Sequence, residues 1–460
     1  MRKFKLFLGI LFSGMAAMAQ GPFFLGTKTP YPAPAGEYTS PPAGFQPVFV
    51  NYVGRHGARF MTKEGPDTEA LRLLDAAEGR QGLTKVGVQV RRMVRRLCAV
   101  EKGQYENITL LGAEEQQAIG QRMLNRYPTV FTGKGLDIVV TYKVRTQQSA
   151  DAFLKAFAGY KGQRRFSKLA DSLDAVLRFY DLSPAYQRYK KSEGLKKALD
   201  SLDRDRRTSE AAAAVAERVF TPGFRAGLKP AEELRFVGNL YDLYSVQFSL
   251  VRETKDSVDL GIAFGAAQLA WEDFVSGAQD FLEKGPGRDP LGIQVKVAAP
   301  LLADFVRRMD EMVKRGAAAA GAGVSGEGGG SAARAEGGCD AVLRFTHAEA
   351  ISPFATLLGI SEASVPASDI YDYSKHWRVG DVIPLSANVQ WIVYSNGKEY
   401  LIKVLLNERE VKLPLGGVGA GGANGPFYRW EELRSYCMAR LKTAGADLGG
   451  DMVNYLKELR

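Results

Sequence analysis

Short apolar runs and helical periodicities alternate along the first third of the chain. Residues 48–53 and 137–141 are almost continuously apolar, which predicts two buried strands. Apolar residues recur every three or four positions between these runs, which predicts helices over about 67–77, 86–97 and 114–127. Another helix, with Phe153 on its apolar face, follows the second strand. Strands that alternate with helices indicate an α/β fold with a mainly parallel sheet.

The pattern changes after residue 158 and returns near residue 339. Residues 159–315 have helical periodicity, for example at Phe236, Leu240 and Phe248, which predicts an inserted α-helical cap. Residues 316–338 are almost wholly Gly, Ala and Ser, which predicts a flexible linker. Strands are then expected at 340–346, 389–394 and 400–406, and helices at 430–441 and 451–459. The first of these strands leads to His347 and Glu349, which would point to the same side if the chain stays extended, since they are two residues apart. The α/β domain is therefore assigned to 20–158 and 339–460.

The N-terminal residues have the pattern of a secretory signal peptide. Three basic residues precede an apolar run that begins at Leu6, and Ala17-Met18-Ala19 matches a small-x-small cleavage site. The run is shorter than the roughly 20 residues that cross a bilayer, so we expect no stable membrane anchor. Residues 1–19 are predicted to be removed, which leaves a periplasmic or secreted protein.

Charge narrows the class of partner. The formal net charge is +10, and it falls to +7 when the three signal-peptide bases are removed. A basic balance suits a small polyanionic substrate, although it also fits a merely basic surface. The chain lacks a long basic tail and an RNA-binding signature, so nucleic acid is not expected as a partner. The oligomeric state is left open.

The cysteines and histidines are few. Cys98, Cys339 and Cys437 allow one disulfide and one free thiol in an oxidising compartment, and the sequence does not assign the pair. The chain has only three histidines and no Cys-x-x-Cys motif, so neither a metal site nor another cofactor is expected.

A cluster of functional residues directly follows the first predicted strand. The sequence there is Arg55-His56-Gly57-Ala58-Arg59. Ligands of open α/β sheets bind at the carboxyl ends of strands, and arginine offers a fork of donors that matches phosphate oxygens. A neutral histidine can act as a nucleophile. This segment therefore predicts a phosphate-binding site with a nucleophilic histidine.

These five residues resemble the RHGxR signature of the histidine acid phosphatases, a branch of the phosphoglycerate-mutase-like fold. His347-Ala348-Glu349 resembles the distal motif of the multiple inositol polyphosphate phosphatase branch of that family, in the order that the family has it. Arg145-Thr146 resembles the strand–Arg–Thr–helix element that supplies another phosphate ligand. The resemblance implies an α/β domain with an α-helical cap, and a phosphomonoesterase that hydrolyses inositol polyphosphates such as phytate.

The same resemblance implies the roles of individual residues. His56 is the expected nucleophile and forms a phosphohistidine, and Glu349 protonates the leaving oxygen. The family often has Pro after RHGxRx, whereas this chain has Met61, followed by Thr62 and Lys63. These last two residues are assigned as additional phosphate contacts. The expected substrate-binding residues are Arg55, Arg59, Arg145, His347, Thr62 and Lys63.

Other functions remain compatible with the sequence. A broad-specificity acid phosphatase or a sugar phosphatase of the same family would share the catalytic residues and differ in the size of its pocket. A mutase of this fold is disfavoured by the signal peptide, since mutase substrates are cytosolic. A protein that binds phosphorylated ligands without hydrolysing them is a possibility from another class, and the retained nucleophile and acid argue against it.

Overall fold

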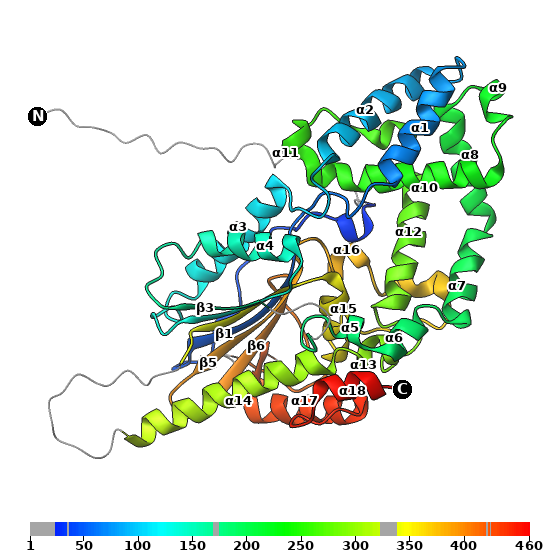
Figure 1. Ribbon diagram of the computed structural model, residues 1–460. Helices are drawn as coiled ribbons and strands as arrows, with labels where there is room; N and C mark the ends of the chain where they lie inside the picture. The colour runs from blue at the N-terminus through cyan, green and yellow to red at the C-terminus, as the bar shows by residue number, and fades with distance from the viewer. Residues whose placement is uncertain (1–23, 35, 169–173, 323–337, 420–421, 424) are drawn as a thin grey trace, which may run out of the picture.

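The computed structural model describes residues 24–34, 36–168, 174–322, 338–419, 422–423 and 425–460 (Figure 1). The predicted signal peptide, residues 1–19, lies outside the described residues. The predicted α/β fold is confirmed: one central sheet is covered by helices on both faces. No helix in the described ranges combines the length and the apolar composition needed to cross a membrane.

The central sheet has the strand order β3-β2-β4-β1-β5-β6-β10-β8-β9, with β7 paired to β6. Its parallel part comprises β3, β2, β4 and β1, and the remaining pairings are antiparallel. Four neighbouring strands in the middle of the sheet are β2 (Leu136–Val140), β4 (Ala341–Thr346), β1 (Gln46–Arg55) and β5 (Asn388–Ser395). The others are β3 (Arg164–Lys168), β6 (Tyr400–Leu406), β7 (Arg409–Glu410), β8 (Val418–Gly419), β9 (Gly422–Ala423) and β10 (Phe427–Arg429).

The parallel register brings three strand ends to one edge of the sheet. Arg55 of β1 lies opposite Thr346 of β4, and Val140 of β2 lies opposite Phe345. Because the three strands run in the same direction, the residues that follow them are neighbours in space. This register places the two histidine motifs together although they are almost 300 residues apart in the sequence.

Helices pack against both faces of the sheet, and its central strands are therefore buried on both sides. On one face Tyr52 and Phe345 contact Phe153, with ring centroids 5.3 and 5.4 Å away. The helices there are α3 (Leu110–Arg126) and α4 (Val144–Lys155). On the other face Trp391 contacts Phe305 at 5.2 Å. That face is covered by α14 (Ala299–Ala322), α15 (Ala348–Leu357), α17 (Trp430–Ala444) and α18 (Met452–Glu458).

A helical lobe with a separate apolar core lies beside the sheet, at the upper right of Figure 1. Its members include α1 (Pro66–Glu78), α2 (Lys85–Glu101), α8 (Arg206–Val219) and α10 (Pro230–Gln247). Between the lobe and the sheet runs α12 (Ala266–Glu283). The remaining helices are α5 (Phe179–Leu182), α6 (Pro184–Tyr189), α7 (Glu193–Asp203), α9 (Pro222–Arg225), α11 (Val251–Thr254), α13 (Ile293–Lys296) and α16 (Val379–Val382), with 3-10 turns η1 (Gly26–Lys28), η3 (Phe248–Leu250), η4 (Leu260–Ala263) and η5 (Ile370–Lys375).

The structure differs from the sequence prediction in which residues belong to the sheet and its covering helices and which belong to the helical lobe. Helices α1 and α2 precede residue 158, yet their apolar faces complete the core of the helical lobe. Strand β3 lies inside the stretch 159–315, which was expected to be wholly helical, and it pairs with β2 at the edge of the sheet. Local periodicity indicates that an element forms, but it does not say against which core the element packs.

The predicted linker also needs correction, and the structure defines the state of the three cysteines. Helix α14 continues to Ala322, and therefore into the predicted linker 316–338, because the alanines there are strong helix formers that outweigh Gly316. Residues 323–337 lie outside the described residues. All three cysteines are described, and each is a free thiol, so the disulfide that the sequence allowed is not formed. Cys437 is fully buried in the apolar core, and Cys98 donates to the Asp67 carbonyl at 3.5 Å.

Candidate active site

The segment Arg55-His56-Gly57-Ala58-Arg59 leaves β1 at the edge of the sheet and is held there by its backbone. The Arg55 N–H donates to the Ala387 carbonyl at 2.7 Å, and the His56 N–H donates to the Thr346 carbonyl at 3.0 Å. The sheet hydrogen bonding thus continues to the nucleophile candidate itself. His56 is only 4% exposed, and its imidazole is fixed at the end of a rigid strand.

Side chains from α3 and α4 hold the rest of this loop. The Gly57 N–H donates to Ser149 Oγ at 3.0 Å, and the Ala58 N–H donates to Glu115 Oε2 at 2.9 Å. Gln116 Nε2 donates to the Arg55 carbonyl at 2.9 Å. Three polar side chains behind the loop therefore satisfy its buried backbone groups, which would be costly to leave unpaired.

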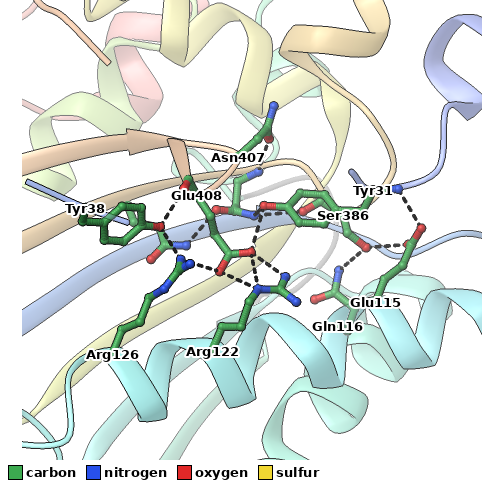
Figure 2. A network of polar contacts seen from close by, with 11 residues as sticks. Tyr31, Tyr38, Glu115, Gln116, Arg122, Arg126, Ser386, Asn407 and Glu408 are labelled. Carbon is green, nitrogen blue, oxygen red and sulfur yellow. Dashed lines mark hydrogen bonds and ion pairs between the residues drawn. The ribbon is translucent and has the colours of Figure 1, made fainter. Parts of the chain in front are cut away.

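These contacts belong to a larger buried network (Figure 2). Ser386 donates through Oγ to Glu115 at 2.8 Å and through its backbone N–H to the His56 carbonyl at 3.0 Å. Tyr31 extends the network, since its N–H donates to Glu115 at 2.9 Å and its hydroxyl donates to Glu408 at 3.1 Å. Glu408 is 3% exposed and accepts 2.6 and 3.0 Å hydrogen bonds from Arg122. The network ties the loop of residues 55–59, called the nucleophile loop because it carries the candidate nucleophile, to the N-terminal arm, α3 and the β6–β7 turn.

The protonation state of His56 suits nucleophilic attack. Its Nδ1 lies 3.0 Å from the Gly57 carbonyl, which can only accept, so Nδ1 carries the proton and Nε2 keeps a free lone pair. Burial lowers the pKa of His56 well below its usual value, and the nearby charges of Arg55, Arg145 and Arg59 lower it further. His56 is therefore neutral at mildly acidic pH.

His347 lies beside His56, with the ring centroids 5.6 Å apart and the rings edge to face. Its Nε2 is 3.2 Å from Thr141 Oγ1, at the end of β2, and 3.3 Å from Arg178 Nη1. A guanidinium only donates, so Nε2 accepts and Nδ1 carries the proton. That Nδ1 is buried and has no partner among the described residues. Burial and the charge of Arg145 lower the pKa of His347 well below its usual value.

The arginines around the two histidines have unused donors. Arg55 is fixed by Nη1, which donates to the Thr27 and Ile383 carbonyls at 2.8 and 2.6 Å, and Arg145 donates from Nη1 to Glu106 at 3.1 Å. Burial lowers the pKa of Arg55 and of Arg59 to about 10, so both stay charged at neutral pH. Buried Nε atoms without a partner among the described residues belong to Arg55, Arg59, Arg145 and Arg178. Such fixed and unsatisfied donors are what a bound tetrahedral anion requires.

Glu349 reaches the site in a different way from the one the sequence suggested. The prediction treated His347 and Glu349 as residues of one extended strand, but β4 ends at Thr346 and α15 begins at Ala348. His347 is the N-cap of α15, and Glu349 stands in its first turn, where a helix favours a negative charge. The Glu349 carboxylate still acts on the histidine, since its negative charge opposes the lowering of the pKa of His347 by burial and by Arg145.

A lysine from the helical insertion completes the surroundings of Glu349. Lys284, which caps α12, lies 3.5 Å from Glu349 Oε1 and 2.7 Å from Asp280 Oδ1. Burial alone would raise the pKa of Glu349, but the charge of the nearby Lys284 ammonium outweighs burial and holds that pKa well below the usual range. In the free protein Glu349 is therefore a carboxylate.

The structure brings six of the eight predicted site residues to one place, namely Arg55, His56, Arg59, Arg145, His347 and Glu349. Thr62 and Lys63 are exposed on the loop before α1, and within the described chain no hydrogen bond or ion pair joins them to the cluster. Their contact with a phosphate stays a prediction.

Sequence reasoning missed Arg178 and Lys284. Both lie in the helical stretch, where a basic residue ordinarily faces solvent, and neither belongs to a motif. Burial is what separates them from ordinary surface bases, since Arg178 is 8% exposed and the Lys284 side chain is 12% exposed. The third histidine, His376, lines a separate cavity of about 430 Å³ together with Arg378 and Arg409.

Comparison with known proteins matches this chain to a family and to solved structures of the same fold. The family model of the histidine phosphatase superfamily (branch 2) matches residues 48–407. The multiple inositol polyphosphate phosphatase of Bifidobacterium longum, solved in complex with inositol hexasulfate, aligns with a TM-score of 0.73 and 21% identity, over 90% of this chain and 97% of that chain. The phytase from D. castellii aligns with a TM-score of 0.65 and 14% identity, over 92% of this chain and 87% of that one. At these identities the solved structures establish the fold, and among curated proteins no sequence matches significantly.

Proposed function

Because this chain belongs to the histidine phosphatase superfamily (branch 2), we propose that it is an exported phosphomonoesterase that hydrolyses inositol polyphosphates such as phytate. One observation carries the proposal: a neutral His56 with a free Nε2 stands among arginines whose buried Nε donors lack partners. The solved relatives that share the fold are named as an inositol polyphosphate phosphatase and a phytase, which supports the choice of substrate.

The proposed reaction has two steps. In the first, His56 Nε2 attacks phosphorus, the bond to the ester oxygen breaks, and Glu349 gives that oxygen a proton as the inositol leaves. In the second, water attacks the phosphohistidine while the Glu349 carboxylate accepts its proton, which releases phosphate and restores the acid. Arg55, Arg59 and Arg145 neutralise the charge on the transferred group, which is the dominant contribution to catalysis in phosphoryl transfer.

His347 and Arg178 have supporting roles in this proposal. Arg178 donates to Nε2 of His347, so the ring presents its protonated Nδ1 to a phosphoryl oxygen. The Arg178 guanidinium is itself held by an ion pair with Asp181 and lies over the ring of Tyr142 at 4.8 Å. A positioned neutral donor adds to the hydrogen bonding of the transferred group without requiring His347 to be charged.

The decisive experiment measures phosphate release by the purified chain from phytate, glucose 1-phosphate, 2,3-bisphosphoglycerate and p-nitrophenyl phosphate across pH. We expect phytate to be the best substrate, and activity to be unchanged by EDTA because the proposed mechanism uses no metal. Preference for a small sugar phosphate would favour the sugar-phosphatase alternative. Binding of phytate without phosphate release would mean a protein that only binds phosphorylated ligands.

Export is a separate part of the proposal, and it is supported by the sequence of residues 1–19. Expressed with its own N-terminus, the protein should be recovered outside the cytoplasm and begin at Gln20. Mass spectrometry of the recovered chain decides this, and a membrane-bound chain that retains Met1 would rule it out.

A further inference from the structure

We propose that Lys284 is a positioning residue that controls when Glu349 acquires its proton. In the free protein the Lys284 ammonium holds Glu349 as a carboxylate. A bound phosphate takes over that ammonium, and Glu349 then takes up a proton from solvent and becomes the general acid. The inference rests on the proposed function, because it assigns the protonation step that the proposed role of Glu349 requires.

The geometry gives Lys284 two unequal partners. Its Nζ lies 2.7 Å from Asp280, four residues earlier on α12, and 3.5 Å from Glu349. The side chains of Lys284 and Asp280 are 12% and 14% exposed, whereas that of Glu349 is 39% exposed. Asp280 therefore anchors the ammonium, and the longer contact with the more exposed Glu349 is the one that an incoming anion can replace.

Among the described residues, Lys284 is the positive group that forms an ion pair with Glu349. The facing titratable groups are Lys284 and Asp280 from α12, His347 and Arg55 from the ends of β4 and β1, Arg59 from the β1–α1 loop, and Tyr180 and Tyr186 from α5 and α6. Burial keeps His347 neutral at mildly acidic pH, and both tyrosines, whose pKa values burial raises further, are neutral there as well. Arg55 is tied to two backbone carbonyls, so Lys284 is the cation that can move between Glu349 and a phosphate.

The chemical consequence is a charge-coupled acid. Removal of a cation at this distance raises the pKa of a carboxyl group by about one to three units, and an anion bound nearby raises it further. Binding and protonation are then linked, so the general acid is formed when a phosphate is present to receive its proton. The Asp280 carboxylate retains Lys284 in the site throughout this exchange.

Calorimetric titration with inositol hexasulfate tests the proposal, because sulfate esters carry no proton at pH 4. Titrations in buffers of different ionisation enthalpy give the number of protons taken up on binding. We expect wild type to take up about one proton more than Glu349→Gln at pH 4. Lys284→Met should lose this difference, since its Glu349 is protonated before the ligand binds. Lys284→Arg keeps the charge and should retain the difference.

The proposal is overturned if wild type and Glu349→Gln take up equal numbers of protons, or if Lys284→Met keeps the wild-type uptake. Should Asp280 destabilise Lys284→Met by losing its partner, Asp280→Asn/Lys284→Met removes both charges and gives the same prediction. If inositol hexasulfate does not bind, inorganic sulfate is used as the probe in its place. Phosphate release from phytate, assayed on the same wild-type sample, tests the proposed function independently of the proton count.

Discussion

At the scale of single residues, the site is a set of groups whose charge states are set by their neighbours. His56 and His347 are kept neutral by burial and by the surrounding arginines, and Glu349 is kept ionised by Lys284. The Gly57 carbonyl fixes which nitrogen of His56 carries the proton. Arg55, Gly57 and Arg59 act on His56 from within the same loop, whereas Arg145 and Lys284 act on the site from positions distant in the sequence.

The lowered pKa of His56 predicts how activity depends on pH. A histidine is nucleophilic only when neutral, and it becomes protonated as the pH falls through its pKa. Since that pKa lies well below the usual value of about 6.5, the rate with p-nitrophenyl phosphate should not decline as the pH is lowered through 6.5. The measurement is kcat/KM between pH 3 and pH 8. An acidic limb centred near 6.5 would contradict the assignment.

Replacement of His56 by alanine provides the covalent test of the nucleophile. Rapid quenching with a ³²P-labelled substrate should trap an acid-labile phosphoprotein in wild type and none in His56→Ala. His376→Ala is the matched control, because that histidine lines a different cavity and should leave labelling intact. Labelling that persists in His56→Ala would identify another nucleophile.

Glu349→Gln separates acid catalysis from a structural role. The substitution keeps the shape but removes the transferable proton, and a proton is needed most when an alkoxide leaves. We expect kcat/KM for phytate to fall by about 10²–10⁴-fold, while kcat/KM for p-nitrophenyl phosphate, whose phenolate leaves unaided, is largely spared. The ratio kcat/KM is compared because it reports formation of the phosphohistidine and not its hydrolysis, in which Glu349 acts as a base for every substrate. Rates with both substrates are compared with those of Glu399→Gln, an exposed control. Equal losses on both substrates would mean that Glu349 only orients the site.

At the scale of elements, the site is assembled at strand ends and helix starts. His56 and His347 follow β1 and β4, and Arg145 and Glu349 lie in the first turns of α4 and α15. The start of α3 supplies the close packing behind the nucleophile loop. A Cβ atom on Gly112 would lie 2.0 Å from the Ala58 carbonyl oxygen, and one on Gly57 would lie 2.5 Å from that of Gly112. Only glycines allow α3 and the loop to come this close.

Gly112→Ala should therefore damage the site without touching substrate. The added methyl meets backbone atoms on a loop that is held by hydrogen bonds, so the loop must shift away from α3. We expect kcat/KM to fall by at least tenfold and the melting temperature to drop, as misplacement of a nucleophile is costly. Gly238→Ala in α10 is the control, because its Cβ meets nothing within 4 Å. Wild-type activity in Gly112→Ala would mean that the contact is not rigid.

At the scale of the whole molecule, the site lies where the sheet meets the helical insertion. The sheet supplies the proposed nucleophile and most of the proposed phosphate-binding groups, and the insertion supplies Arg178 and Lys284. Behind the sheet edge, the network around Glu408 joins the N-terminal arm to α3 and to the β6–β7 turn (Figure 2). Stability and the position of the nucleophile loop are thus coupled through one set of buried polar contacts.

Glu408→Gln tests this coupling. The amide keeps the size of the side chain but cannot accept the charged hydrogen bonds from Arg122 in the same way. Loss of hydrogen bonds to a charged group costs about 1.5–3 kcal/mol, so the free energy of unfolding should fall by that amount. Urea denaturation measures it, with Glu399→Gln as the exposed control that should change little. A stability equal to that of wild type would show that the hydrogen bonds between Arg122 and Glu408 do not contribute to the free energy of unfolding.

The sequence by itself determined the α/β fold, the two histidine motifs and the core of the site. These follow from local patterns: a strand is evident from its apolar run, and a nucleophile loop from residues that stand side by side in the chain. The sequence was less successful where the start of a helix decided the geometry, as at Glu349, which lies in α15 and not on a strand.

The tertiary structure decided which distant residues complete the site and set its charges. Arg178 and Lys284 have no distinguishing sequence signal, because their burial depends on how the insertion folds over the sheet edge. The packing of α1 and α2 with α8 and α10 is equally invisible in their periodicity, which gives an apolar face but not its partner. The pKa values follow the same rule, since burial and charge are properties of the assembled surroundings and not of a residue's neighbours in the chain.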